Sequence, residues 1–181
     1  MQGELKQVEV RLRLADGHSG AYSAVPMNTP EAARDAMQGI LVGMDREYLC
    51  VVNVDSHYRP LNYNIVSMGT VREWSVSVAN VFKAAILSNA NGVILFLNHP
   101  SGDVLPTEDD RAVVKKAVWA GELLGINVTD CLVIGGGNGS YYSFTEQGLI
   151  TDYKGKYQDK LQEKPQERAV WRKKKPRGKA L

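Results

Sequence analysis

One histidine and several carboxylates lie close together between residues 96 and 110, in the stretch FLNHPSGDVLPTEDD. The stretch follows an apolar run, so its polar residues begin where a buried strand is expected to end. His99 and Asp110 are residue types that bind zinc, but a catalytic zinc takes three protein ligands and a water molecule. The stretch therefore predicts either a metal centre with a third ligand elsewhere or the remains of such a centre.

The expected secondary structure decides which of these side chains can meet. In the strand that ends at His99, residues two apart point the same way, so Leu97 shares its face and Asn98 points to the opposite one. After the PSG turn, the next helix brings Asp110 into its first turn. A neighbouring strand begins at Glu47. We therefore expect His99 and Asp110 to converge on one point, with Glu47 available to complete the site.

Apolar periodicity predicts six strands and three helices. The strands are 7–14, 46–55, 61–69, 92–99, 126–136 and 140–148, and the helices are 28–41, 75–90 and 107–124. Residues 92–99 are apolar on both faces, which favours a central strand. The glycine-rich turn at 135–139 favours a hairpin over a phosphate-binding loop, because no helix follows it. The predicted fold class is α/β, with a mixed β-sheet flanked by helices.

Local signals fix several helix boundaries. Helix 28–41 is expected to begin at Asn28 or Thr29 with Pro30 in its first turn, and helix 107–124 to end at Gly125. Helix 75–90 should be capped by a serine, Ser75 or Ser77. Its buried face is predicted to consist of Val78, Val81, Phe82, Ala85 and Ile86.

The stretch SVANVFKAAILSNANGVILFLNHPSGDVLPTEDD, with GELLGINVTDCLVIGGGNGSYYSFTEQGLI after it, resembles the RadC family of bacterial JAB/MPN domains. The resemblance runs from about residue 29 to residue 150. It implies an MPN/JAB fold of cytidine-deaminase-like architecture and a metalloprotease-like hydrolytic activity. In the JAMM zinc site of this family, two His and one Asp bind the metal and a Glu activates the bound water. RadC relatives are commonly labelled DNA repair proteins, which links this chain to repair by resemblance alone.

The resemblance assigns roles to individual residues. Glu47 matches the general base, His99 the second histidine ligand, and Asp110 the carboxylate ligand. Thr107 matches the hydroxyl residue that helps to stabilise an oxyanion. Leu97 stands at the position of the first histidine, and its side chain has no lone pair to give a metal. The zinc site that the resemblance implies is therefore weakened by one ligand.

Few residues can replace the missing ligand. Asp103, in the loop after His99, is the best substitute that the sequence offers. The remaining histidines are His18 and His57, and His57 lies in a turn at the far end of the strand that begins at Glu47.

Two functions stay open. The first is a degenerate, weakly active or non-catalytic binding or scaffold module, which Leu97 favours. The second is a zinc-dependent peptidase or isopeptidase that uses His99, Asp110 and a substitute ligand, with Glu47 as general base. Each residue also has an ordinary structural explanation. Thr107 and Asp110, for example, form the T-x-x-D pattern of a capping box.

Charge divides the chain into two parts. Residues 154–181 carry eleven Lys and Arg against three acids, a net charge of +8, whereas residues 1–153 carry −6. The candidates for nucleic-acid binding are Arg172, Lys173, Lys174 and Lys175, beside Trp171. They predict sequence-tolerant contact with phosphates, and the alternative is a solvated charge run. Residues 156–164 have the composition of a charged helix with i,i+4 pairs.

These observations divide the chain into a lead-in with a strand (1–28), a JAB/MPN domain (29–153) and a basic tail (154–181). No run of 18 apolar residues predicts a membrane span, and the charged N-terminus is unlike a signal peptide. Cys50 and Cys131 lie in apolar runs, which favours buried thiols in a reducing cytosol. We expect a cytoplasmic protein with a polypeptide substrate or partner and without membrane association.

Overall fold

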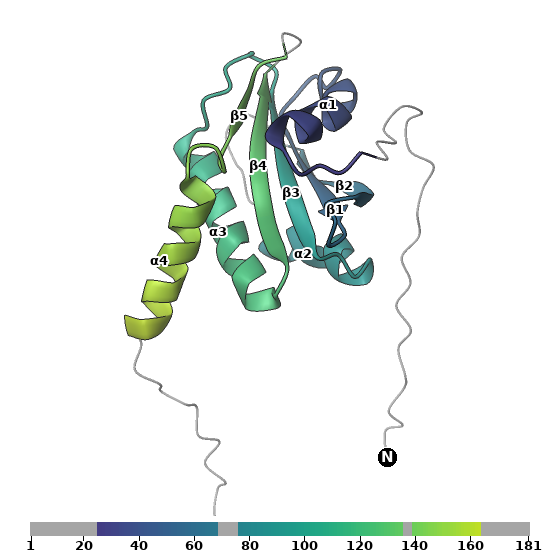
Figure 1. Cartoon of the computed structure of the whole chain (residues 1–181). Coiled ribbons are helices and arrows are strands. Elements are labelled where there is room, and N and C mark those ends of the chain that lie inside the picture. The colour runs from purple at the N-terminus through teal and green to yellow at the C-terminus, as the bar shows by residue number, and fades with distance from the viewer. Residues whose placement is uncertain (1–24, 69–75, 136–138, 164–181) are drawn as a thin grey trace, which may run out of the picture.

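The computed structural model describes residues 25–68, 76–135 and 139–163, which form one mixed sheet with helices on both faces (Figure 1). The strands are β1 (Tyr48–Val54), β2 (Pro60–Met68), β3 (Gly92–His99), β4 (Asn127–Gly135) and β5 (Tyr141–Ser143). The helices are α1 (Pro30–Leu41), α2 (Val78–Leu87), α3 (Glu108–Leu124) and α4 (Leu149–Glu163). The predicted α/β class is confirmed.

The strands follow the spatial order β2-β1-β3-β4-β5. β1 pairs antiparallel with β2 and with β3, β3 pairs parallel with β4, and β4 pairs antiparallel with β5. A parallel pair needs a crossover connection, and α3 supplies it between β3 and β4. β3 is the central strand and all eight of its residues are buried, as its apolar sequence predicted.

The two faces of β3 belong to two apolar clusters. Val93, Leu95 and Leu97 pack in a cluster with residues of α2, α3 and α4. Ile94 and Phe96 pack in the other cluster, with residues of α1 (Figure 1). Side chains alternate along a strand, so the odd-numbered residues of β3 point to the α3 side of the sheet. The last residue of β3, His99, is therefore expected on that side.

Capping residues explain where the helices begin and end. The Thr29 hydroxyl accepts a hydrogen bond from the Ala32 amide at 3.2 Å, and Pro30 occupies the first position of α1. α3 starts after Thr107 and ends at Gly125, whose φ of 70° suits glycine. Ser77 is the N-cap residue of α2, although its side chain makes no capping hydrogen bond.

The prediction for Ile86 was wrong, since 54% of its surface is exposed. Each residue turns an α-helix by about 100°, which places Ile86 roughly a quarter-turn from the centre of the buried stripe of Val81, Phe82 and Ala85. The strand predicted at 140–148 is also shorter than expected, because β5 stops at Ser143 and the chain turns into α4.

α4 crosses the predicted boundary between residues 153 and 154. The Trp119 indole N–H donates to the Tyr153 carbonyl at 2.9 Å and so anchors α4 on α3. Further along α4, Lys156 pairs with Asp152 at 2.6 Å, an i,i+4 pair of the predicted kind. The strand predicted at 7–14, part of the glycine-rich turn (136–138) and the basic residues 172–175 lie outside the described residues.

The structure bears on the predictions for the two cysteines and for membrane spans. Cys50 and Cys131 are both buried as free thiols. Among the described residues, no helix combines the length and the apolar character needed to cross a lipid bilayer.

Candidate metal centre

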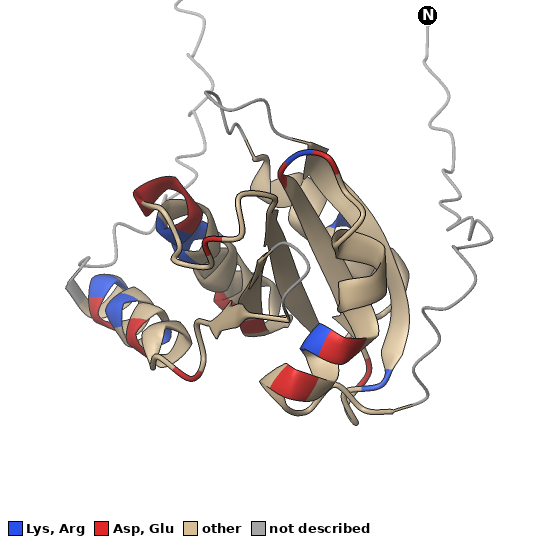
Figure 2. Ribbon diagram, turned by 90° about the horizontal axis from the view of Figure 1, so that it is seen from above, with Lys and Arg blue, Asp and Glu red and all other residues tan. Residues whose placement is uncertain are grey.

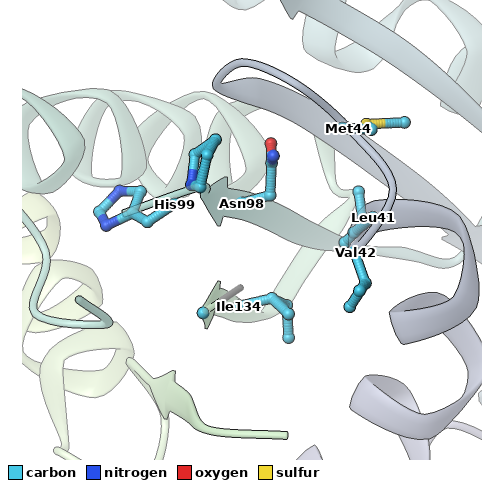
Figure 3. A pocket seen from close by; sticks show the side chains of 8 residues that line it. Leu41, Val42, Met44, Asn98, His99 and Ile134 are labelled. Atoms are coloured by element: carbon cyan, nitrogen blue, oxygen red, sulfur yellow. The ribbon is translucent and has the colours of Figure 1, made fainter. Parts of the chain in front are cut away.

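His99 ends β3 with its imidazole on the α3 side of the sheet. Its Nδ1 atom donates to the carbonyl oxygen of Asp103 at 2.8 Å, because a carbonyl can only accept. The other ring nitrogen, Nε2, lies 3.4 Å from Oδ2 of Asp110. Figure 3 shows that the ring points away from Leu41 and Ile134, which line a small pocket on the α1 side. The predicted convergence of His99 and Asp110 is confirmed.

Asp110 is held by the N-terminus of α3. Its Oδ2 atom accepts hydrogen bonds from the Thr107 amide at 2.8 Å and from the Thr107 hydroxyl at 2.7 Å. The Thr107 hydroxyl oxygen accepts in return from the Asp110 amide at 3.2 Å, which completes the capping box that the T-x-x-D pattern predicted. The single oxygen Oδ2 thus receives the Thr107 donors and faces His99.

The two partners shift each other's pKa toward the charged forms. The hydrogen bond to Asp110 raises the pKa of His99 against the lowering effect of burial, and the Asp103 carbonyl also contributes. Burial acts to raise the pKa of Asp110, but the hydrogen bonds from His99 and Thr107 outweigh it, and the pKa lies below its usual value. Both shifts favour an ion pair between an imidazolium and a carboxylate.

Glu47 lies beside this pair. Tyr48 pairs with Asn98 and Leu49 with Leu97, so the strand register continues to place Glu47 next to His99. Alternation along β1 puts Glu47 on the same face as Leu49, which is the α3 side. The charge of Glu47 contributes to the raised pKa of His99. Glu47 therefore lies beside His99 on the α3 side of the sheet.

Asn98 points to the opposite face, as predicted, and has a role that the sequence did not reveal. Its Oδ1 atom accepts from the Tyr48 amide at 2.6 Å, and its Nδ2 atom donates to the Arg46 carbonyl at 2.8 Å. These two bonds hold the backbone on both sides of Glu47. A buried amide at the end of an otherwise apolar strand is the one sequence signal that could have pointed to this role.

Leu97 lies on the same face of β3 as His99, two residues earlier in the strand. It is buried and packs in the apolar cluster of the α3 side. Its neighbours in the sheet are Leu49 of β1 and Val133 of β4. The surroundings of Leu97 are therefore apolar, and the side chain fills its place as part of the core.

Asp103 approaches His99 with its backbone and not with its carboxylate. Its Oδ1 atom accepts from the Leu105 amide at 2.9 Å, and the side chain is exposed. The loop lies tightly against the end of β4, where a Cβ atom on Gly135 would come within 2.8 Å of the Gly102 carbonyl oxygen. The loop therefore supplies the carbonyl acceptor that orients the imidazole.

This donor set does not fit a four-coordinate zinc site. His99 and Asp110 provide two donors, and Leu97 provides none. Among the residues that the structure describes, no group of three or more His, Cys, Asp and Glu side chains comes together in an arrangement suited to a metal ion.

Comparison with known proteins places the chain in a family. The sequence model described as RadC-like JAB domain matches residues 27–149, which include the whole of the sheet. The chain belongs to the RadC-like JAB family.

Two curated members of this family show how far the similarity extends. A UPF0758 protein of Symbiobacterium thermophilum is 36% identical over 144 residues, which cover 76% of this chain and 61% of the relative. A UPF0758 protein of Chloroflexus aggregans is 32% identical over 151 residues, which cover 81% of this chain and 65% of the relative. The chain thus spans a little under two thirds of the length of these relatives.

Proposed function

We propose that this RadC-like JAB domain is a binding or scaffold module whose JAMM-type zinc site is degenerate at Leu97. The observation that carries the proposal is the contact of His99 with Asp110 beside a buried leucine. The two remaining ligands contact each other, and Leu97, at the third ligand position, is part of the apolar core. A protein fold of this family would then serve to bind a polypeptide partner without hydrolysing it.

The balance of ligands supports this proposal on physical grounds. A metal at this site would have to separate the buried contact between His99 and Asp110, which Thr107 supports. It would gain only two protein donors in exchange, whereas catalytic zinc sites provide three. Asp103 would become a third donor only if its carboxylate gave up the bond to the Leu105 amide and turned toward His99.

The alternative is a zinc-dependent peptidase or isopeptidase. Two observations favour it: Glu47 lies beside His99, and the Asp103 carbonyl fixes the imidazole with Nε2 directed inward. A metal-binding histidine usually donates its second ring N–H to such an acceptor. Both features fit descent from an active site, but neither of them supplies a third metal ligand.

Metal content separates the two functions. The protein is purified without added zinc, and zinc is measured by inductively coupled plasma mass spectrometry in the wild type and in a His99→Ala variant. We expect far less than one zinc per chain in both. A stoichiometric zinc content in the wild type that disappears in His99→Ala would support the hydrolase and refute the scaffold.

For the tail, we propose sequence-tolerant contact with nucleic acid through Arg172, Lys173, Lys174 and Lys175. The described helix before it is charge-balanced, since its three lysines are matched by Asp152, Asp159 and Glu163 (Figure 2). A chain that ends after Glu163 keeps α4 complete. It should lose salt-dependent affinity for DNA, and unchanged affinity would remove the proposal.

The free thiols of Cys50 and Cys131 fit a cytoplasmic location.

A further inference from the structure

β2 forms an edge of the sheet, and the outer edge of β2 is suited to pairing with a further strand. Among the described residues, it pairs with β1 only. Its sequence, PLNYNIVSM, contains no charged residue, and its one proline stands at the first position, outside the strand interior. Natural edge strands are usually protected by lysines, inward charges, prolines or β-bulges. The pairing of β2 with β1 is irregular at Leu61 and Val66. Because β2 has no charge and no internal proline, its outward backbone groups between these two points are open to pairing.

One face of this edge is apolar and uncovered. Ile65 and Met68 are 46% and 66% exposed. Ile65 lies opposite Cys50 and Met68 opposite Tyr48, which places both on the α1 side of the sheet. α1 packs mainly against β4, and Tyr63 is the residue of β2 that packs against the apolar cluster of α1. At Ile65 and Met68, the α1 side of β2 therefore lacks a covering element within the described part of the chain.

The chain enters the described structure next to this edge. The Met27 amide donates to the Tyr58 carbonyl at 2.8 Å, in the turn between β1 and β2. The residues before Met27 therefore approach the sheet at the Pro60 end of β2. The segment 7–14, QVEVRLRL, alternates apolar and charged side chains over eight residues, a length that matches β2.

The connection is long enough for this segment to reach β2. Residues 15–24 number ten and span at most about 33–36 Å when extended, whereas nine strand residues span roughly 30 Å. An antiparallel arrangement places Leu14 at the Pro60 end, so the ten residues need only form a loop. A parallel arrangement would require nearly full extension.

We propose that residues 7–14 add to the free edge of β2 as an antiparallel strand. Val8, Val10, Leu12 and Leu14 then extend the apolar face of Ile65 and Met68, and Glu9, Arg11 and Arg13 lie on the other face. The added strand pairs the open backbone groups of β2 and covers its apolar side. This inference does not depend on the proposed function.

Hydrogen exchange of the full chain tests the proposal. Val10→Pro removes a backbone N–H and disrupts a strand at its centre, whereas Ser19→Pro makes the same change in the connection. We expect amides of residues 61–68 to exchange about tenfold faster in Val10→Pro and at the wild-type rate in Ser19→Pro. Unchanged protection of residues 92–99 shows that the core stays folded. Should Val10→Pro not fold, Leu12→Asp tests the same contact through the apolar face.

Three outcomes would overturn the proposal. The first is equal exchange of residues 61–68 in the wild type and in Val10→Pro or Leu12→Asp. The second is rapid exchange of these amides already in the wild type. The third is protection that disappears on dilution together with a dimer in sedimentation equilibrium, because a second copy would then cover β2.

The orientation of the added strand is tested by disulfide formation, which should be faster for Leu14→Cys with Leu61→Cys than for Val8→Cys with Leu61→Cys. The opposite preference would refute the antiparallel arrangement.

Discussion

Nε2 of His99 lies 3.4 Å from Oδ2 of Asp110, and both side chains are less than one tenth exposed. The contact joins the end of the central strand to the first turn of α3. The contact raises the pKa of His99 and lowers the pKa of Asp110, so it favours the charged form of each side chain. The pair therefore contributes to the stability of the domain.

Replacement of Asp110 by Asn should expose this contribution. The variant removes the negative charge of Asp110 and leaves Glu47 as the anion beside the imidazole. The weakened contact should cost about 1–3 kcal/mol in the free energy of unfolding. Urea unfolding measures this loss, and the pKa of His99 measured by NMR should fall in the same variant. Asp109→Asn, at an exposed neighbouring position, is the control and should change neither quantity. Equal stability of both variants would contradict the ion pair.

Stability should depend on pH in a defined direction. The pKa of His99 is raised above its ordinary 6.5, so its contribution is complete below pH 6.5 and is lost as pH rises through the folded-state pKa. The pKa of Asp110 is lowered below its ordinary 3.8, so its contribution is complete above pH 3.8 and is lost as pH falls through the folded-state pKa.

The pair should therefore stabilise the protein most between these two ordinary values. The difference in unfolding free energy between the wild type and His99→Gln, measured from pH 5 to pH 9, isolates this contribution. We expect it to decrease with rising pH. A difference that is constant over this range would show that His99 does not change its charge there.

Asn98 should position the backbone around Glu47. Replacement by Ala removes the bonds to the Tyr48 amide and the Arg46 carbonyl, at a cost of about 2 kcal/mol in unfolding free energy. The Tyr48 amide should then exchange faster with solvent. Asn80→Ala, on the exposed side of α2, is the matched control. It should change the unfolding free energy by less than about 0.5 kcal/mol and leave the exchange rate of the Tyr48 amide unchanged. A Tyr48 amide that stays protected would contradict the assigned role.

Gly135 should control the loop that orients His99. In a Gly135→Ala variant the new methyl group would lie 2.6 Å from the Ser140 hydroxyl oxygen and 2.8 Å from the Gly102 carbonyl oxygen. The loop must shift, which costs about 1–3 kcal/mol. The shift should also weaken the bond from His99 Nδ1 to the Asp103 carbonyl.

The NMR signal of the Nδ1 proton detects this change. Gly43→Ala is the control, because no atom lies within 4 Å of its added methyl group. A Nδ1 proton signal that is identical in the wild type and Gly135→Ala would show that the loop does not depend on this glycine.

Local rules were enough to predict where His99 and Asp110 meet. Period-two alternation placed Leu97 on the face of His99 and turned Asn98 away, and the capping pattern placed Asp110 in the first turn of α3. Both rules act over a few residues, so they hold without knowledge of the tertiary structure.

The part that the sequence did not reveal depends on contacts between distant segments. The sequence suggested the carboxylate of Asp103 as a ligand, whereas the structure directs its carbonyl to His99, because the loop packs against Gly135. The bonds from Asn98 to residues on both sides of Glu47 join segments about fifty positions apart. The anchor of α4 on α3, from the Trp119 indole to the Tyr153 carbonyl, likewise joins distant segments.

The most direct test of the central proposal is the zinc affinity of Leu97→His compared with the wild type, measured by competition with a chromophoric chelator. Leu97→Met serves as the control for a change of volume without a new ligand. If Leu97 marks the missing ligand, Leu97→His should bind zinc at least about tenfold more tightly than the wild type and Leu97→Met. Equal zinc affinity in the wild type and Leu97→His would contradict the proposal that this site lost its metal through Leu97.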